Sequence, residues 1–230
     1  MALRVLTWNL FHGRSVPDSR RSLLPDFAAM IAGWEWDVAL LQEVLPWWPA
    51  ELGRASDASA RMALTSRNIL PPLQRLVTER RPDLFKSWSG GCNAILVRGQ
   101  GIREHRVRRL RLTPERRVAH GVLLDDGTWV TNLHAQAHAE RLAQADLDLA
   151  AEATTQWAAG APTVLGGDLN LRGTPTAHGF EHLAGHGVDH VLGRGLRTVE
   201  AGRTLDRGAL SDHAPVTVAA ERTPPPAGSA

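Results

Sequence analysis

Residues 163–170 read Thr-Val-Leu-Gly-Gly-Asp-Leu-Asn, a short apolar run that ends in a carboxylate and an amide. Apolar runs also lead into an amide in residues 5–9, Val-Leu-Thr-Trp-Asn, and into an amide and a carboxylate in residues 38–43, Val-Ala-Leu-Leu-Gln-Glu. Ser-Asp-His at residues 211–213 stands just before another apolar run. An α/β scaffold places polar groups at the ends of buried strands, where they can converge on a substrate. The recurrence therefore predicts a functional site built from strand ends.

The rest of the chain predicts more strands than helices. Asp126-Gly127 is a strong turn signal between two strand-like runs, 118–124 and 128–133, and predicts a hairpin. Because hairpins mix with crossovers, the pattern favours a mixed sheet or a pair of sheets over a purely parallel one. The other predicted strands are residues 3–8, 37–42, 93–97, 102–112, 163–165, 188–192, 196–200 and 214–220.

Helical spacing of apolar residues predicts two clear helices. The first covers residues 18–34, with Asp18 as its N-cap or, alternatively, Pro25 marking its first turn. The second covers residues 139–159 and stops at Gly160. Residues 46–81 suggest a further helix, which two adjacent prolines interrupt.

The length fits one large domain or two small ones, and the composition shows no break before about residue 222. The chain has 230 residues, and its 43% hydrophobic share is enough for a substantial core. We expect one domain over residues 1–222 and a disordered proline-rich tail over 223–230. A single cysteine, Cys92, excludes an intrachain disulfide and leaves a thiolate metal site without ligands. No apolar run approaches the ~20 residues of a membrane span, so we expect a soluble cytoplasmic protein.

Charge does not by itself identify a partner, because the formal net charge is only +2. Arginines cluster between residues 98 and 117. Such a cluster suits a polyanion such as nucleic acid. It equally suits the solvated faces of two strands, and the sequence leaves both interpretations open.

The polar residues at the predicted strand ends suit a divalent metal ion and proton transfer. Glu43, Asp168, Asp212 and Asn9 offer the hard oxygen ligands that Mg²⁺, Mn²⁺ or Ca²⁺ prefer. Two imidazoles, His134 and His213, can move protons near neutral pH. A carboxylate such as Asp189 commonly orients a catalytic imidazole. Each residue taken alone has a structural interpretation as a turn former, a helix cap or a core histidine, and their joint occurrence favours a site.

Six motifs follow one another from about residue 3 to residue 218, which is nearly the whole chain. They are Thr7-Trp8-Asn9, Gln42-Glu43, Asn132-Leu133-His134, Gly167-Asp168-Leu169-Asn170, Asp189-His190-Val191 and Ser211-Asp212-His213. This ordered set resembles the endonuclease/exonuclease/phosphatase superfamily, the DNase I-like phosphodiesterases. The resemblance implies an α/β fold, a four-layer sandwich in which two mixed β-sheets pack face to face with helices outside.

The resemblance also implies a metal site. Glu43 matches the main metal-binding glutamate, Asn9 matches the asparagine beside the metal, and Asp212 matches an acid near it. The implied cofactor is Mg²⁺, with Mn²⁺ or Ca²⁺ as alternatives.

The remaining motif residues match catalytic groups of the superfamily. Asp168 and Asn170 match the pair that aligns the attacking water and the scissile phosphate. His213 matches a histidine described either as general base or as stabiliser of phosphate charge, and Asp189 matches the acid that orients it. His134 matches a histidine that contacts the phosphate or protonates the leaving group.

One departure from the superfamily pattern disfavours one of its known activities. The chain has no tyrosine, whereas the abasic-site nucleases use one in the active site, so that activity is disfavoured. Asn93, after a glycine-rich stretch, is a further candidate for phosphate contact.

The sequence therefore predicts a metal-dependent phosphodiesterase with nucleic acid as the first substrate class. Phospholipid headgroups and small phosphate esters remain alternatives, because fold does not choose among them. A non-catalytic binding module of the same fold is the alternative from another class. A serine hydrolase built on Ser211 and His213 is disfavoured, because no Gly-x-Ser-x-Gly elbow occurs.

Overall fold

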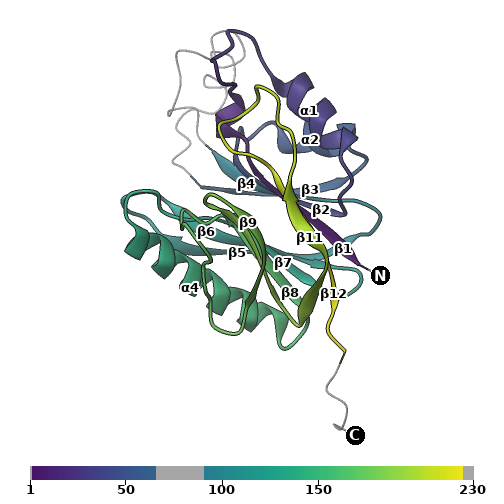
Figure 1. Cartoon of the computed structure of the whole chain (residues 1–230), viewed down its shortest axis with the longest axis vertical. Coiled ribbons are helices and arrows are strands. Elements are labelled where there is room, and N and C mark those ends of the chain that lie inside the picture. Colours follow the sequence, from purple (N-terminus) through teal and green to yellow (C-terminus); the bar gives the residue numbers. More distant parts are fainter. Residues whose placement is uncertain (1, 66–90, 225–230) are drawn as a thin grey trace, which may run out of the picture.

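The computed structural model describes residues 2–65 and 91–224, which form two six-stranded β-sheets packed face to face (Figure 1). The first sheet has the strand order β11 (Leu196–Thr204), β12 (Val216–Arg222), β1 (Leu3–Asn9), β2 (Val38–Val44), β4 (Cys92–Val97) and β3 (Ser59–Leu64). The second has the order β5 (Ile102–Arg111), β6 (Arg117–Leu124), β7 (Trp129–His134), β8 (Thr163–Asp168), β10 (Asp189–Arg194) and β9 (Glu181–His186).

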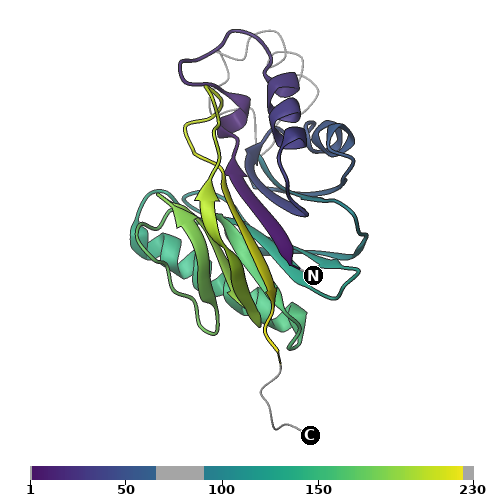
Figure 2. The ribbon, with the colours of Figure 1, turned by 45° about the vertical axis from the view of Figure 1, so that its right-hand side comes forward.

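Both sheets are mixed. One central pair in each sheet, β1–β2 and β7–β8, is parallel. The other neighbouring strands pair antiparallel, including β12 with β1, which run side by side in Figure 2. The prediction of mixed sheets rather than a parallel one is confirmed.

Helices cover the outer face of each sheet (Figure 1). The helices α1 (Leu24–Gly33) and α2 (Pro49–Ala55) pack on the first sheet, and α4 (Glu140–Ala158) packs on the second. The order of layers is thus helix, sheet, sheet, helix. This confirms the four-layer α/β sandwich that the family resemblance implied.

The central strands are buried on both faces, which explains why their sequences do not alternate. In β1, Val5 faces the second sheet and packs with valines such as Val130 and Val164. Its neighbours Leu6 and Trp8 face the opposite way and pack in the cluster that contains α1 and α2. Both sides of the strand are therefore apolar.

The first helix begins later than the alternative that used Asp18. Its N-cap is Leu23, and Pro25 lies in the first turn. Proline suits that position because its missing N–H would have no partner inside the helix. The Asp18 cap was wrong, and the alternative based on Pro25 is confirmed.

Two strands escaped the sequence prediction. The segment predicted as helix from residue 46 contains α2 and then the strand β3, and its part from residue 66 to 81 lies outside the described residues. The strand β9 was not predicted at all. Both β3 and β9 are edge strands with largely exposed side chains, so their hydrophobic pattern is weak.

The C-terminal strand β12 ends at Arg222, and residues 225–230 of the predicted tail lie outside the described residues. Within the described ranges, no helix combines the length and the apolar character needed to cross a membrane. The domain boundary and the cytoplasmic location stay predictions.

Candidate active site

Strand pairing brings the predicted residues to one end of the two sheets. Asn9 ends β1, His134 ends β7 and Asp168 ends β8. The register pairs Asp168 with both His134 and Asp189, which begins the antiparallel strand β10. Residues far apart in the sequence are thus neighbours because their strands start or stop at the same level.

A series of short contacts connects the carboxylate of Glu43 to the imidazole of His213. Glu43 Oε1 lies 3.8 Å from His134 Nε2, which lies 3.6 Å from Asp168 Oδ2. Asp168 Oδ2 in turn lies 3.9 Å from His213 Nε2. These groups therefore form one cluster of side chains.

Asp189 and His213 form the tightest pair in this cluster. His213 Nδ1 lies 2.7 Å from Asp189 Oδ2. Burial alone would lower the pKa of His213, but the hydrogen bond to Asp189 and the charges of Asp189, Asp168 and Asp212 raise the pKa to about 9. Asp212 stands at the rim, 45% exposed, with Oδ1 3.8 Å from His213 Nε2. The acidic neighbours therefore favour the protonated form of the imidazole.

Asp168 is held by two donors on opposite oxygens. Asn9 Nδ2 donates to Oδ2 at 2.9 Å, and the backbone N–H of Asn170 donates to Oδ1 at 3.1 Å. Burial and the nearby charge of Asp189 raise the pKa of Asp168 to about 7, although His213 and both hydrogen bonds oppose the rise. Asp168 is thus a fixed carboxyl group whose pKa lies near neutrality.

The side chain of Asn9 is oriented by its own backbone. Its Oδ1 accepts the N–H of Phe11 at 2.9 Å, which leaves Nδ2 for Asp168. The side chain of Asn170 is likewise occupied, because Nδ2 donates to the carbonyl of Ala135 at 3.0 Å. Both amides therefore hold the geometry of Asp168 and the loop that follows it.

Unusual backbone conformations aim several of these side chains. Glu43 has φ 49° and lies where the β2–β4 register shifts between Leu41 and Val44. Such bulges commonly redirect a side chain beside an active site. Asn170 and Ser211 also have positive φ, at 51° and 60°. Left-handed residues other than glycine cost free energy and cluster at functional sites.

The Ser211 side chain stabilises the loop that carries His213. Its hydroxyl is fully buried and donates to the carbonyl of Asn9 at 2.6 Å, while the N–H of His213 donates to the same Oγ at 3.1 Å. Arg207 donates to the carbonyl of Ser211 at 2.6 Å. These bonds fix the approach of His213 and leave Ser211 with no access to a substrate, so a serine hydrolase is excluded.

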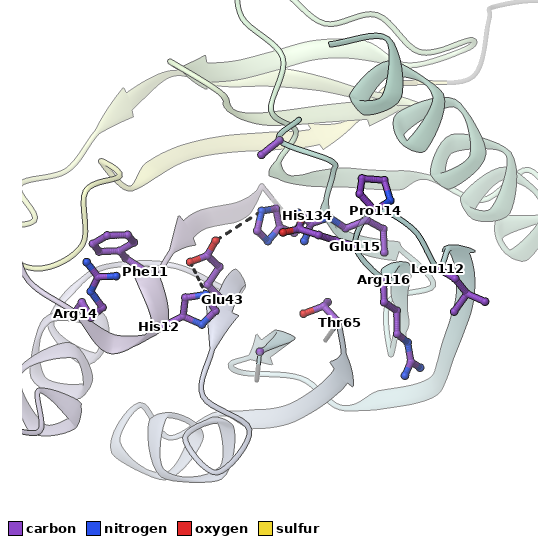
Figure 3. Close-up of a pocket in the computed structure, with 13 residues that line it drawn as sticks. Phe11, His12, Arg14, Glu43, Thr65, Leu112, Pro114, Glu115, Arg116 and His134 are labelled. Atoms are coloured by element: carbon purple, nitrogen blue, oxygen red, sulfur yellow. Dashed lines mark hydrogen bonds and ion pairs between the residues drawn. The ribbon is translucent and has the colours of Figure 1, made fainter. Parts of the chain in front are cut away.

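Sequence reasoning missed His12, whose ring lies beside Glu43. His12 Nε2 is 3.1 Å from Glu43 Oε2, and Figure 3 shows Glu43 between His12 and His134. Burial lowers the pKa of His134 well below its usual range, and the charges of Arg117, His12 and His213 lower it further. No spacing signal pointed to His12, because its left-handed φ of 53° and the turn Phe11–Gly13 create the contact.

A cleft of about 570 Å³ opens in front of Glu43 and His134 (Figure 3). One side is formed by the turn after β1, with His12 and Arg14. The other is formed by residues 112–117, the turn between β5 and β6. A volume of this size suits a small molecule or a short part of a polymer.

Most arginines of the 98–117 cluster are bound within the protein. Arg98 donates to three backbone carbonyls and stacks on Trp36. Arg103, Arg106, Arg108 and Arg111 pair with Asp125, Glu104, Glu152 and Asp146, respectively. The interpretation as a strand face thus fits β5, whereas Arg116 and Arg117 line the cleft.

The donor set fits a divalent cation. Oxygen atoms of Asp168 and Asp189 and a ring nitrogen of His213 lie within 4.8 Å of one another. Asp189 Oδ1 is buried with no hydrogen-bond partner in the part of the chain that the structure describes. Buried carboxylates need nearby positive charge to stay ionised. Glu43 and Asp168 offer the hard oxygens that such an ion prefers.

Two mixed sheets with a carboxylate–imidazole cluster at their converging strand ends define a DNase I-like domain. Residues 6–213 match the Endonuclease/Exonuclease/phosphatase family, and the chain belongs to this family.

Solved structures share this fold. An endonuclease/exonuclease/phosphatase from Beutenbergia cavernae is 20% identical, with a TM-score of 0.71 over 96% of this chain and 72% of that one. Truncated TDP2 from Caenorhabditis elegans is 17% identical, with a TM-score of 0.66 over 96% and 98% of the two chains. A mannosyl-6-phosphatase from Bacteroides thetaiotaomicron is 16% identical, with a TM-score of 0.63 over 95% and 99%. No curated protein sequence matches this chain.

Proposed function

We propose that this protein is a divalent-metal-dependent phosphoesterase that hydrolyses phosphodiester bonds, with nucleic acid as its substrate class. The observation that carries the proposal is the contact series from Asp189 through His213, Asp168 and His134 to Glu43. The last two members of this series, His134 and Glu43, line an open cleft. Membership of the Endonuclease/Exonuclease/phosphatase family supports the hydrolysis of phosphoric esters.

In this proposal, Asp168 orients the attacking water and accepts its proton. Its two hydrogen bonds fix the direction of the carboxyl group, and its pKa of about 7 suits proton transfer near neutral pH. Of the two roles that the family resemblance offers for His213, a pKa of about 9 favours charge stabilisation. The imidazolium would donate a hydrogen bond to a phosphate oxygen as charge builds there.

His134 is proposed to contact the phosphate or the leaving oxygen from the opposite side. Its lowered pKa keeps the ring neutral, so one nitrogen can donate and the other can accept. Asn9 is proposed to position Asp168, because its oxygen already accepts a backbone N–H.

Glu43 would hold the metal, and Asp212 would add a carboxylate at the rim. The ion, when bound, acts as a Lewis acid on the phosphate oxygens. Mg²⁺ is the proposed ion, with Mn²⁺ and Ca²⁺ as alternatives. Each has the preference for oxygen ligands that this donor set meets.

A phosphatase acting on a small phosphate ester is the second candidate. The cleft volume of about 570 Å³ favours it, since sites of this size commonly enclose a small ligand. The fold is also similar to that of the mannosyl-6-phosphatase from Bacteroides thetaiotaomicron.

The proposal is tested with bis(p-nitrophenyl) phosphate, plasmid DNA, RNA and p-nitrophenyl phosphate, each with Mg²⁺ or with EDTA. Asp168→Ala and His213→Ala should each lower kcat by at least ~100-fold. Asp148→Ala, at an exposed carboxylate of α4, is the control and should behave as wild type.

Turnover that persists in EDTA, or that survives both substitutions, would overturn the mechanism. Folded protein that turns over none of the esters with Mg²⁺ would instead indicate a binding module. Turnover of the monoester alone would support the phosphatase.

A further inference from the structure

The turn between β5 and β6 gives the cleft a second cationic wall, away from the reacting groups. Arg116 and Arg117 both line the cleft, together with Leu112, Pro114 and Glu115. Figure 3 shows Arg116 across the cleft from His12, with the Thr65 side chain between them. A substrate held at Glu43 and His134 would extend toward this wall.

The guanidinium of Arg116 has no hydrogen-bond acceptor among the residues that the structure describes. It forms no ion pair or side-chain hydrogen bond within residues 2–65 and 91–224, and its Nε is buried away from solvent. Burying a charged donor without a partner costs free energy. Arg14, on the other side of the cleft, is different, because it pairs with Asp18 and lies over the ring of Phe11. Arg116 can thus donate its N–H groups to an anion bound in the cleft.

Arg117 reinforces this wall from behind. It is only 5% exposed, and its Nε is also buried without a partner in the described part of the chain. Its guanidinium pairs with the carboxylate of Glu115, which is half exposed at the cleft. Its charge contributes to the low pKa of His134, so the wall lies within electrostatic reach of the reacting groups.

The turn is fixed before any ligand binds. Arg111, at the end of β5, lies 2.9 Å from the fully buried Asp146 of α4. Gln136, just after β7, donates to the carbonyl of Glu115 at 2.6 Å. These contacts hold the backbone of the turn at both ends, so the position from which Arg116 reaches the cleft is fixed.

We propose that Arg116, supported by Arg117, binds a second phosphate of the substrate, next to the scissile one on a nucleotide chain. The inference rests on the proposed phosphodiesterase function. A guanidinium presents two parallel N–H groups that match a phosphate, and it keeps its charge at any physiological pH. The cleft would then select a substrate with phosphates on successive units over an isolated ester.

The test compares two chromogenic esters. The first is the p-nitrophenyl ester of thymidine 5′-phosphate, and the second carries an additional 3′-phosphate. For wild-type protein, the added phosphate should raise kcat/KM by about 10- to 100-fold, the scale of a hydrogen bond to a charged group. Arg116→Gln should remove most of this gain and leave kcat/KM for the first ester within about threefold.

Arg109→Gln is the matched control, because Arg109 is exposed on β5 and does not line the cleft. It should retain the full gain. An equal gain in wild type and Arg116→Gln would overturn the inference, whereas no turnover of either ester would overturn the proposed function first.

Binding provides a readout that does not need turnover. Titration calorimetry in EDTA should show that thymidine 3′,5′-bisphosphate binds wild type at least about 10-fold more tightly than thymidine 5′-phosphate does, and that Arg116→Gln loses the difference. Equal affinity of wild type for fructose 1,6-bisphosphate would overturn the assignment to a nucleotide chain.

Discussion

The neighbours of His213 determine the pKa and the orientation of its imidazole. An isolated histidine is half protonated at pH ~6.5. Here the hydrogen bond to Asp189, with the charges of Asp189, Asp168 and Asp212, outweighs the effect of burial and raises the pKa to about 9. The pair is formed across 24 residues of sequence. The carboxylate thus both orients the ring and determines its charge.

Asp189→Asn should lower the pKa of His213 below 9, because the amide keeps the shape of the side chain and removes its charge. NMR titration of the imidazole in metal-free protein measures this shift. We expect kcat to fall by at least ~100-fold with a much smaller change in KM. Asp148→Asn controls for a general effect of losing one carboxylate. An unchanged pKa of His213 would contradict the assigned role of Asp189.

At the scale of elements, the end of β8 depends on a close approach of two backbones. Gly167 has φ 139°, and a Cβ added there would lie 1.9 Å from the carbonyl oxygen of Leu133 in β7. Glycine is therefore required one residue before Asp168. The strand register that brings Gly167 against Leu133 also places Asp168 beside His134. Two residues of the Gly-Asp-x-Asn motif are therefore explained by the same strand pairing, one through packing and one through its place in the site.

Gly167→Ala should destabilise the protein by at least ~2 kcal/mol, from the clash with β7 and the unfavourable φ. Chemical denaturation measures the free energy of unfolding. Gly33→Ala, at the end of α1 with no atom within 4 Å of the added Cβ, should change it by less than ~1 kcal/mol. Equal stability of Gly167→Ala and wild type would show that β7 and β8 are not held this closely.

At the scale of the whole molecule, the space between the sheets is apolar in the middle and polar toward the site. Asn132 in β7 donates to the carbonyls of Leu41 and Ala94 and accepts from Gln42, so it ties the second sheet to the first. His120 in β6 is also fully buried, and neither ring nitrogen has a hydrogen-bond partner within the described residues. Burial, aided by the charge of His105, lowers the pKa of His120 to about 3.

His120 should make the fold sensitive to acid. Between pH ~6.5 and ~3 the unfolded chain binds a proton at this position that the folded chain excludes, so each unit of falling pH costs about 1.4 kcal/mol. Stability from this group is complete above pH ~6.5 and is lost as pH falls toward ~3. His120→Leu should reduce the slope of the unfolding free energy against pH in this window by about 1.4 kcal/mol per pH unit, which corresponds to one proton. His138→Gln, at an exposed histidine, should leave it unchanged, and an identical slope in His120→Leu would contradict the prediction.

Local sequence patterns indicated mixed sheets and a site at strand ends, and the family resemblance added the four-layer sandwich and the roles of most site residues. Unbroken apolar runs predicted strands buried on both faces, and polar residues at their ends predicted where the chemistry would gather. Asp168, Asp189 and His213 were found in this way, because each stands beside a strand whose local pattern is strong.

The neighbours of those residues became known from the tertiary structure. His12 meets Glu43 through a left-handed turn, and Arg116 faces the cleft while its neighbours on β5 pair with acids elsewhere. The edge strands β3 and β9 are defined by the strands they pair with. The physical reason is common to all three cases. A local pattern records whether a side chain is buried, whereas its partner is set by strand register and loop conformation, which depend on distant segments packing together.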